Sequence, residues 1–456
     1  MAERYDVIIL GGGNAGFGVS AVVHEAGRSI AFVEERDFGG TCPNRGCTPK
    51  KVLVAAGHAL HEIELAAAHG IDVGKPKLDW AKLIDRERGM VDFIPDAMEG
   101  VAKKRGDVYH GHAKFVGPNA IEVRGEVDGP DGAQILEGKD IVVATGSKPM
   151  SLPISGAELM ITSDEMLTER ELPEEVVFVG GGVIALEFGH VYARAGAKVT
   201  ILEVMDRLLP RLDADAVAKV QEESERIGIT VKTGVKVSQI TKSNGRLQVL
   251  FEHEGAVHTL DADRVVNGAG RVANVDTLDL AAGGISHDGI RIEVDAYLRS
   301  TTNPSVWVCG DALVGPAQLS PLATVEGRIV GRNIVDGAKH SPDYANVPSC
   351  VHTVPAFASV GLTEQEARAS GLEVDVSTND MTGWFSAKSY AETAAWAKVL
   401  VDRAKDRIVG AHMVGHHGEE LIHLFALAMS HDIPVSKLKD DQFAFPTFSS
   451  DVKNLL

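Results

Sequence analysis

The stretch DVIILGGGNAG, residues 6–16, decides the fold of the first part of this 456-residue chain. The apolar, β-branched run that ends at Leu10 predicts a buried strand, and a glycine-rich turn follows it at once. A helical pattern over 17–26 and a second apolar strand over 29–33 come next, and this strand ends in Glu34. Strand, glycine turn, helix and a strand ending in an acid form the fingerprint of a βαβ unit that binds a dinucleotide.

Each glycine of this turn has an expected task. Gly11 permits the tight turn, Gly13 lets the backbone approach a pyrophosphate, and Gly16 allows the helix to pack closely on the strand. Glu34 follows Gly11 by 23 residues, near the spacing of about 20 expected for an acid that binds a ribose hydroxyl. These residues therefore predict a first dinucleotide site.

The same arrangement recurs in the middle of the chain. A strand over 176–179 runs into Gly180, and a later strand over 198–202 ends at Glu203. Gly180 and Glu203 are again 23 positions apart, so we expect a second dinucleotide site. The residues expected to bind this second nucleotide are Gly180, Gly182, Ala185, Glu203 and Gly270.

Between the two units lies the stretch GGTCPNRGCTPKKVL, residues 39–53, with cysteines at 42 and 47. In an undistorted helix two residues five apart are offset by about 7.5 Å, so a disulfide between them requires a bend. Pro43 and Gly46 lie where such a bend would go. The apolar residues that follow predict a helix starting near Cys47, and a helix N-terminus lowers the pKa of a thiol. A redox pair is the favoured interpretation of Cys42 and Cys47.

Other interpretations of the pair stay open at this point. A zinc site could add His58 and His61, but their spacing fits the usual Cys/His pattern poorly. A structural disulfide needs an oxidising compartment, whereas four cysteines in a chain of this length are typical of a reducing one. Inert thiols are the remaining alternative.

Charge and composition exclude several classes of partner. The formal net charge of −19 and the pI near 5.3 argue against nucleic acid and against an anionic membrane surface. The N-terminus lacks the pattern of a signal peptide, and no apolar stretch reaches the roughly 18 residues of a membrane span. We expect a cytoplasmic protein with about three domains.

The remaining segments fit around the two nucleotide units. A strand over 140–144 leads into Gly146, and a strand over 305–308 leads to Asp311, an acid suited to a ribityl hydroxyl. From about residue 340 a proline-bearing linker precedes a last segment typical of a packing or dimerisation module. The predicted domains are 1–150 with 271–340, 151–270, and 341–456.

Chemistry suggests which unit holds which nucleotide. A disulfide exchanges two electrons readily with a flavin, and a nicotinamide passes hydride to that flavin. The first unit is contiguous with the cysteines and should hold FAD, and the second should hold the nicotinamide nucleotide. Glu203 favours a free 2′-hydroxyl and therefore NADH over NADPH, a preference that Arg207 could soften.

These elements in this order resemble the pyridine nucleotide-disulfide oxidoreductases, the family of glutathione reductase, dihydrolipoamide dehydrogenase and mercuric reductase. The resemblance covers essentially the whole chain and is most specific at Gly-Gly-Thr-Cys, with a second cysteine five residues later followed by Pro49 and Lys51. It implies an α/β fold with two Rossmann-like domains, for FAD and NAD, and a C-terminal α+β dimerisation domain that forms a homodimer.

The resemblance also implies roles for single residues. Cys42 would attack the substrate, Cys47 would be the thiol nearer the flavin, and Lys51 would pair with Glu187 beside the reactive edge of the flavin. The residues expected to contact FAD outside the first glycine turn are Thr41, Lys51, Ala113, Gly146, Asp311 and Ser320.

The tail departs from the family pattern. Family members carry His-Pro-Thr with a Glu five residues after the His, and this dyad moves the proton of the leaving thiol. This chain has Phe445, Pro446 and Thr447, with Ser450 in place of the Glu. General acid/base catalysis contributes about 10²–10⁴-fold, so ordinary alkyl disulfides should be reduced poorly.

The expected function is NADH-dependent, FAD-mediated reduction of a small disulfide or related sulfur compound through Cys42 and Cys47. The alternative is a diaphorase, or a quinone or metal-ion reductase, in which the acceptor needs no proton from the missing histidine. A redox-sensing or binding protein without turnover is a third possibility. The tail also lacks the paired C-terminal cysteines of mercuric reductase, which argues against the reduction of mercuric ion.

Overall fold

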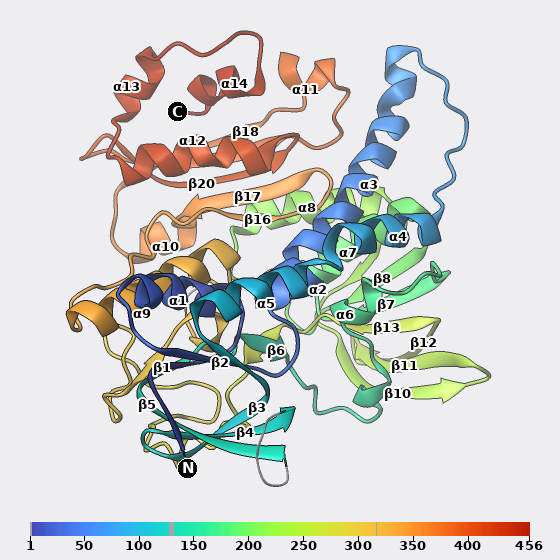
Figure 1. Ribbon diagram of the computed structural model, residues 1–456. Helices are drawn as coiled ribbons and strands as arrows, with labels where there is room; N and C mark the ends of the chain where they lie inside the picture. The colour runs from blue at the N-terminus through green and yellow to red at the C-terminus, as the bar shows by residue number, and fades with distance from the viewer. Residues whose placement is uncertain (1, 127–131, 316) are drawn as a thin grey trace. The chain divides into compact units, whose positions relative to one another are not determined.

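The computed structural model describes residues 2–126, 132–315 and 317–456 (Figure 1). The chain divides into two compact units. The first consists of Met1–Pro49, Arg86–Met150 and Arg271–Tyr344, and the second of Lys50–Asp85, Ser151–Gly270 and Ala345–Leu456. The predicted division into three domains stays a prediction, since compactness groups 151–270 and 345–456 in one unit.

The first unit is built on a mixed sheet. Its strands are β1 (Glu3–Leu10), β2 (Ile30–Glu34), β3 (Asp107–Gly117), β4 (Ala120–Glu126), β5 (Ala133–Val143) and β15 (Val306–Val308). Strand β1 pairs in parallel with β2 and β5, and β15 extends β5 in parallel. Ile8, Ile9 and Val142 are fully buried, as expected for parallel strands covered on both faces. The predicted strand at the start of the chain is confirmed.

Two glycines let the helices of this unit approach closely. Helix α1 (Asn14–Glu25) lies beside α9 (Ser320–Asp336), as Figure 1 shows. A Cβ atom on Gly18 would lie 2.6 Å from Thr324 O, and one on Gly327 would lie 2.1 Å from Ala15 O. Only glycine fits either position, so the contact fixes the N-terminal end of α1 beside the start of α9.

The second unit contains a four-stranded parallel sheet in the order β13-β7-β8-β9. Its strands are β7 (Glu175–Val179), β8 (Lys198–Leu202), β9 (Thr230–Lys232) and β13 (Arg264–Asn267). Helix α7 (Val183–Ala195) follows the second glycine turn, and α8 (Ala214–Arg226) precedes β9. A three-stranded antiparallel sheet has β10 (Lys236–Ser243), β11 (Arg246–His253) and β12 (Ala256–Ala262). The second predicted βαβ unit is confirmed.

The last segment of the chain forms an antiparallel sheet in the order β16-β17-β20-β19-β18. Its strands are β16 (Ser349–Val351), β17 (Ala356–Gly361), β18 (Val374–Asp380), β19 (Trp396–Asp402) and β20 (Arg407–Gly415). Helix α12 (Gly418–Ser430) lies against β17 and β20 and buries Ile422 and Phe425 (Figure 1). The α/β class with two βαβ units and a C-terminal α+β segment agrees with the sequence prediction.

The other helices range from four residues in α6 to nineteen in α3. They are α2 (Thr41–Arg45), α3 (Cys47–Leu65), α4 (Trp80–Val91), α5 (Ile94–Arg105), α6 (Ser163–Met166), α10 (Glu364–Ala369), α11 (Phe385–Ser389), α13 (Val435–Asp440) and α14 (Phe448–Leu455). The short strands β6 (Ser147–Pro149) and β14 (Arg271–Ala273) pair with each other. Within the described residues, no helix has the length and apolar character needed to span a membrane.

Candidate active site and nucleotide sites

The first glycine turn has the geometry that its sequence predicts. Gly11 has φ +110°, and a Cβ atom there would lie 2.3 Å from Ala144 O. A Cβ atom on Gly16 would lie 2.2 Å from Gly11 O, so α1 packs directly on the turn. At Gly13 the nearest atom to an added Cβ is Gly40 Cα, at 3.7 Å. Gly13 thus keeps a less crowded side, as close approach of a pyrophosphate requires.

Glu34 is held against this turn by two backbone amides. Its Oε2 accepts from Gly12 N at 2.7 Å, and its Oε1 accepts from Arg36 N at 2.8 Å. Both oxygens are oriented by the chain itself, so the carboxylate has a fixed position at the end of β2. A preoriented carboxylate at this point suits the hydroxyls of a ribose.

Glu203 repeats this arrangement in the second unit. Its Oε2 accepts from Gly181 N at 2.5 Å, and its Oε1 accepts from Met205 N at 2.8 Å. Gly180 has φ +106°, and a Cβ atom there would lie 2.5 Å from Ala269 N. Ala185 is fully buried at the start of α7, where it occupies the helix-packing position that Gly16 has in the first unit.

The two other glycines predicted to bind the second nucleotide differ in the space around them. At Gly182 the nearest atom to an added Cβ is Gly268 O, at 3.2 Å. Gly270 has φ +105°, and an added Cβ would meet none of the described residues within 4 Å. The backbone is therefore open to a ligand at Gly270, whereas Gly182 is closely packed against Gly268.

Arg207 is engaged by its own loop. Its guanidinium donates to Leu209 O at 3.3 Å, to Leu212 O at 3.1 Å, and to Pro210 O. A guanidinium that donates to three carbonyl oxygens has few N–H groups left for a phosphate. The softening of nucleotide preference expected from Arg207 has no support in this geometry.

The first unit also has unsatisfied polar atoms that fit a bound flavin nucleotide. Thr145 Oγ1 and Asn44 Oδ1 are buried and have no hydrogen-bond partner among the described residues. Gly146 has φ +69°, and an added Cβ there would meet no described atom within 4 Å. Buried polar atoms are nearly always paired in proteins, so these residues fit a polar ligand such as FAD.

The other residues predicted to contact FAD lie in the same unit, except for Lys51. Asp311 accepts from Ser147 Oγ at 3.0 Å, and burial raises the pKa of its carboxyl. Ser320 Oγ accepts from Asn14 Nδ2, which joins the starts of α9 and α1. Ala113 is buried in β3, and Thr41 is exposed at the start of α2.

The cysteine segment is bent as predicted. Cys42 lies in α2, Cys47 is the first residue of α3, and Gly46 separates the two helices. A Cβ atom on Gly46 would lie 2.9 Å from Thr41 O and 3.2 Å from Cys42 Cα. The bend therefore brings the backbone before Cys47 back against Cys42. Cys42 is half-buried and Cys47 is exposed.

The same segment is attached to the first glycine turn. Gly39 N donates to Gly12 O at 2.8 Å, and Gly13 and Gly39 form a parallel bridge. Cys42 and Cys47 thus come directly after a segment that is hydrogen-bonded to the first glycine turn. Among the described residues, no group of three His, Cys, Asp or Glu side chains is arranged to hold a metal ion.

The predicted pairing of Lys51 with Glu187 is wrong. Lys50 makes this ion pair, with its Nζ 2.8 Å from Glu187 Oε1. Lys51 Nζ instead lies 3.1 Å from His352 Nδ1 and 3.6 Å from Glu419 Oε1. Consecutive residues of a helix point about 100° apart, and in α3 this rotation turns Lys50 inward and Lys51 toward the surface.

His352 completes the environment of Glu187. Its backbone N–H donates to Glu187 Oε1 at 2.8 Å, so one carboxylate oxygen receives both this amide and Lys50. Burial, with the positive charges of Lys50 and Lys51, lowers the pKa of His352 to about 4. Sequence spacing gave no sign of His352, which comes directly after the short strand β16.

The tail offers no replacement for the missing dyad among its described residues. Phe445 is 84% exposed. Thr447 caps α14, where its Oγ1 accepts from Ser450 N at 3.2 Å and Ser450 Oγ donates to Thr447 O at 2.6 Å. Ser450 therefore serves the helix cap.

Comparisons with known proteins agree with this geometry. Residues 5–327 match the family profile described as pyridine nucleotide-disulphide oxidoreductase, and residues 347–456 match its dimerisation domain. A dihydrolipoyl dehydrogenase of Bacillus subtilis (strain 168) is 31% identical, over 99% of this chain and 97% of its own. The mitochondrial dihydrolipoyl dehydrogenase of Dictyostelium discoideum is 32% identical, over 99% of this chain and 93% of its own.

Solved structures give the same result. The HOCl-induced flavoprotein disulfide reductase RclA from Escherichia coli matches with a TM-score of 0.86 and 27% identity, over 99% of each chain. The Cu(II) complex of that protein matches with a TM-score of 0.87 and 28% identity, over 99% of each chain.

Proposed function

The chain belongs to the pyridine nucleotide-disulphide oxidoreductase family, and from this premise we propose that it passes electrons from NADH through Cys42 and Cys47 to a small disulfide. FAD is the flavin of this family, and when bound it accepts two electrons from the nicotinamide and delivers them to a disulfide. The overall reaction is NADH + H⁺ + RSSR → NAD⁺ + 2 RSH.

One observation carries the proposal. The segment that holds Cys42 and Cys47 is hydrogen-bonded to the first glycine turn through Gly39 and is sharply bent at Gly46. A thiol pair in a bent segment at the start of a nineteen-residue helix suits thiol–disulfide exchange, because the helix N-terminus favours thiolate.

The cysteines divide the exchange into two steps. In the proposed sequence the Cys42 thiolate attacks one sulfur of the substrate disulfide, a Cys42–substrate bond forms, and the first substrate thiol leaves with a proton. The Cys47 thiolate then attacks Cys42 sulfur, which forms the Cys42–Cys47 disulfide and releases the second substrate thiol. Each step exchanges one S–S bond for another.

The second unit supports NADH as the electron donor. Both oxygens of Glu203 are oriented by backbone amides, and the buried carboxylate would accept from a free 2′-hydroxyl and repel a 2′-phosphate. Arg207 donates to three carbonyl oxygens of its own loop. We therefore propose a preference for NADH over NADPH.

The missing dyad limits the classes of electron acceptor that the protein could reduce efficiently. An acceptor whose leaving thiol is already acidic needs little help from a general acid, whereas an alkyl disulfide loses the usual contribution of about 10²–10⁴-fold. We propose an activated disulfide or related sulfur compound as the substrate class.

The assembly and domain structure complete the proposal. The match of residues 347–456 to a dimerisation domain supports a homodimer. We assign the FAD-binding domain to 1–150 with 271–340, the NAD-binding domain to 151–270, and the dimerisation domain to 341–456. The acidic composition and the scarcity of cysteine support a cytoplasmic location.

A second candidate function is reduction of a quinone or a metal ion by the reduced flavin. It is favoured by the exposed phenyl ring of Phe445 in place of a proton donor, because electron transfer to Cu(II) needs no general acid. The similar RclA protein is described as a Cu(II) complex.

Replacement of Cys42 by Ser separates the two candidates. We expect Cys42→Ser to lose disulfide reduction while the reduction of bound FAD by NADH stays at the wild-type rate. Cys350→Ser is a control for the loss of a thiol outside the Cys42–Cys47 pair, since Cys350 lies in β16 and donates to Phe357 O at 3.3 Å. Full disulfide reduction by Cys42→Ser would overturn the first candidate, and loss of quinone and Cu(II) reduction in this variant would overturn the second.

A further inference from the structure

Helix α3 carries a stripe of basic side chains inside the second unit. Lys50, Lys51, His58 and His61 fall within about 100° of one another on the helix circumference. Acidic side chains from other segments face this stripe. They are Glu187 in α7, Glu419 in α12 and Glu392 after α11. We use the name α3 ladder for the eight residues Lys50, Lys51, His58, His61, Glu187, Glu392, Glu419 and His352.

One end of the α3 ladder consists of short, direct contacts. Glu187 Oε1 accepts from Lys50 Nζ and from His352 N, each at 2.8 Å. His352 Nδ1 lies 3.1 Å from Lys51 Nζ, and Lys51 Nζ lies 3.6 Å from Glu419 Oε1. Since the ammonium of Lys51 can only donate, His352 Nδ1 accepts and its proton is on Nε2.

The other end is centred on Glu392. Its two oxygens lie 3.0 Å from His61 Nε2 and 2.9 Å from His416 Nδ1. Burial would raise the pKa of Glu392, but the hydrogen bonds from His416 and His61 outweigh burial and hold the pKa at about 2. The Glu392 carboxylate fixes a proton on His61 Nε2, so Nδ1 is the His61 nitrogen that remains to accept a hydrogen bond.

Two polar atoms of the α3 ladder are unsatisfied. His61 Nδ1 and Glu419 Oε2 are buried and have no hydrogen-bond partner among the described residues. His58 lies between Lys51 and His61 along α3, and the charged or titratable groups near it are Glu419, Lys51, His61 and His416. Buried polar atoms of this kind are usually satisfied by internal water, which would join the two ends of the ladder.

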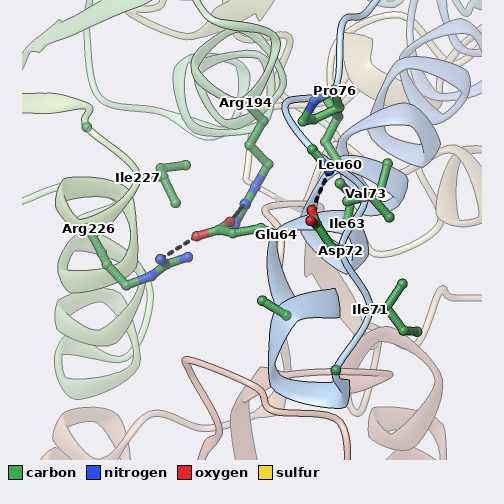
Figure 2. A pocket seen from close by; sticks show the side chains of 14 residues that line it. Leu60, Ile63, Glu64, Ile71, Asp72, Val73, Pro76, Arg194, Arg226 and Ile227 are labelled. Carbon is green, nitrogen blue, oxygen red and sulfur yellow. Dashed lines mark hydrogen bonds and ion pairs between the residues drawn. The ribbon is translucent and has the colours of Figure 1, made fainter.

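A cavity of about 790 Å³ lies beside the C-terminal part of α3, where Leu60, Ile63 and Glu64 line it (Figure 2). Glu64 lines this cavity, and its Oε2 lies 3.9 Å from His61 Nδ1. Figure 2 shows Glu64 between Arg194 and Arg226, and both ion pairs are 2.7 Å long. Water in the cavity can therefore reach the carboxylate that faces the unsatisfied nitrogen of His61.

We propose that the α3 ladder conducts protons from water in this cavity, through Glu64, His61, His58 and Glu419, to Lys51 and His352, and from there to the first substrate thiol that leaves during disulfide reduction. The inference rests on the proposed function, because that reaction consumes one proton per turnover and the tail carries Phe445 where a proton donor is expected. Lys50 and Lys51 follow Cys47 by three and four residues in α3, so the ladder begins one helical turn along this helix from the cysteine.

The test compares two disulfides that differ in the acidity of the leaving thiol. Dithiobis(nitrobenzoic acid) releases an acidic thiol that leaves without a proton, whereas hydroxyethyl disulfide releases an alkyl thiol that needs one. We expect His58→Gln and His61→Gln to slow the reduction of hydroxyethyl disulfide about tenfold, in line with lost proton transfer, and to leave the aromatic disulfide unaffected. Proton uptake, followed with an indicator dye, should slow by the same factor.

His412→Gln is the matched control for the loss of a buried histidine. His412 lies outside the ladder, with its Nε2 3.0 Å from Leu362 O. Structural damage would slow both disulfides, so the ratio of the two rates separates proton transfer from misfolding. Glu392→Gln gives a second variant that keeps the shape of the site and should change the same ratio.

The outcomes are distinct. A changed ratio in the ladder variants with a normal ratio in His412→Gln supports the α3 ladder. An unchanged ratio in all ladder variants overturns it, as does a wild-type protein that reduces only the aromatic disulfide. If the wild-type protein reduces neither disulfide although NADH reduces its FAD, both the proposed function and proton conduction by the α3 ladder are overturned.

Discussion

Lys50 Nζ and Glu187 Oε1 form a buried ion pair of 2.8 Å that joins α3 to α7 in the second unit. The side chains are only 13% and 6% exposed, whereas the neighbouring side chain of Lys51 is 46% exposed. Two adjacent lysines of one helix therefore differ in what they contribute. Lys50 neutralises a buried carboxylate, and Lys51 joins a partly solvated network with His352 and Glu419.

We predict that Lys50→Met destabilises the protein much more than Lys51→Met. Removing one partner of a buried pair leaves the other charge buried, so Lys50→Met should lower the free energy of unfolding by about 3 kcal/mol. Loss of the partly exposed Lys51 should cost less than about 1 kcal/mol. Urea unfolding of the FAD-loaded variants measures both values, and equal losses would contradict the assignment.

The ion pair of Lys50, instead of Lys51, with Glu187 shows what local sequence can and cannot predict. The bend at Gly46 and the helix start near Cys47 follow from residues that are neighbours in the chain, and both predictions agree with the structure. The choice between Lys50 and Lys51 depends on the helix phase relative to α7. Glu187 lies 137 residues after Lys50, and no local pattern fixes that relation.

The nucleotide turns and the α3 ladder differ in the same way. Glu34 and Glu203 were predictable because turn, helix and acid lie within one βαβ unit and the acid binds its own turn. Glu392 binds His61 across 331 residues, and His352 binds Lys51 across 301. Such contacts depend on how separate segments pack, so sequence spacing gave no sign of them.

We predict that Glu203→Gln weakens the preference for NADH. The substitution removes the charge that would bind a ribose hydroxyl and repel a 2′-phosphate, and a hydrogen bond to a charged group contributes about 1.5–3 kcal/mol. The kcat/KM for NADH should fall at least about tenfold, while that for NADPH should rise relative to it. Steady-state kinetics with both nucleotides measure the change, with Glu222→Gln, a carboxylate exposed on α8, as control.

We predict that Glu326 makes stability depend on pH between about 4.5 and 7. Burial raises the pKa of this carboxyl from 4.5 to about 7, although Gly310 N and Tyr344 hydrogen-bond to it. Between these values the folded state binds one more proton than the unfolded state, so stability falls as pH rises. The loss is at most roughly 3 kcal/mol over this window.

Glu326→Gln isolates this contribution. A glutamine can still accept from Gly310 N and donate to the Tyr344 oxygen, but it cannot ionise. The difference in unfolding free energy between wild type and variant should therefore shift in favour of the variant as pH rises from 4.5 to 7. Urea unfolding at several pH values measures the shift, and parallel curves would show that Glu326 does not titrate in this range.

We predict opposite effects for alanine at Gly46, just before α3, and at Gly57 within α3. An added Cβ on Gly46 would lie 2.9 Å from Thr41 O and 3.2 Å from Cys42 Cα, both backbone atoms that cannot move independently. Gly46→Ala should therefore cost about 1–3 kcal/mol and slow the reduction of an aromatic disulfide, because the bend that carries Cys42 must open. In Gly57→Ala the nearest contact of the new Cβ is an ordinary 3.6 Å, inside α3. This control should gain up to about 1 kcal/mol from helix propensity and keep its activity.

A Gly46→Ala variant as stable and as active as Gly57→Ala would show that the tight bend is unnecessary for thiol–disulfide exchange.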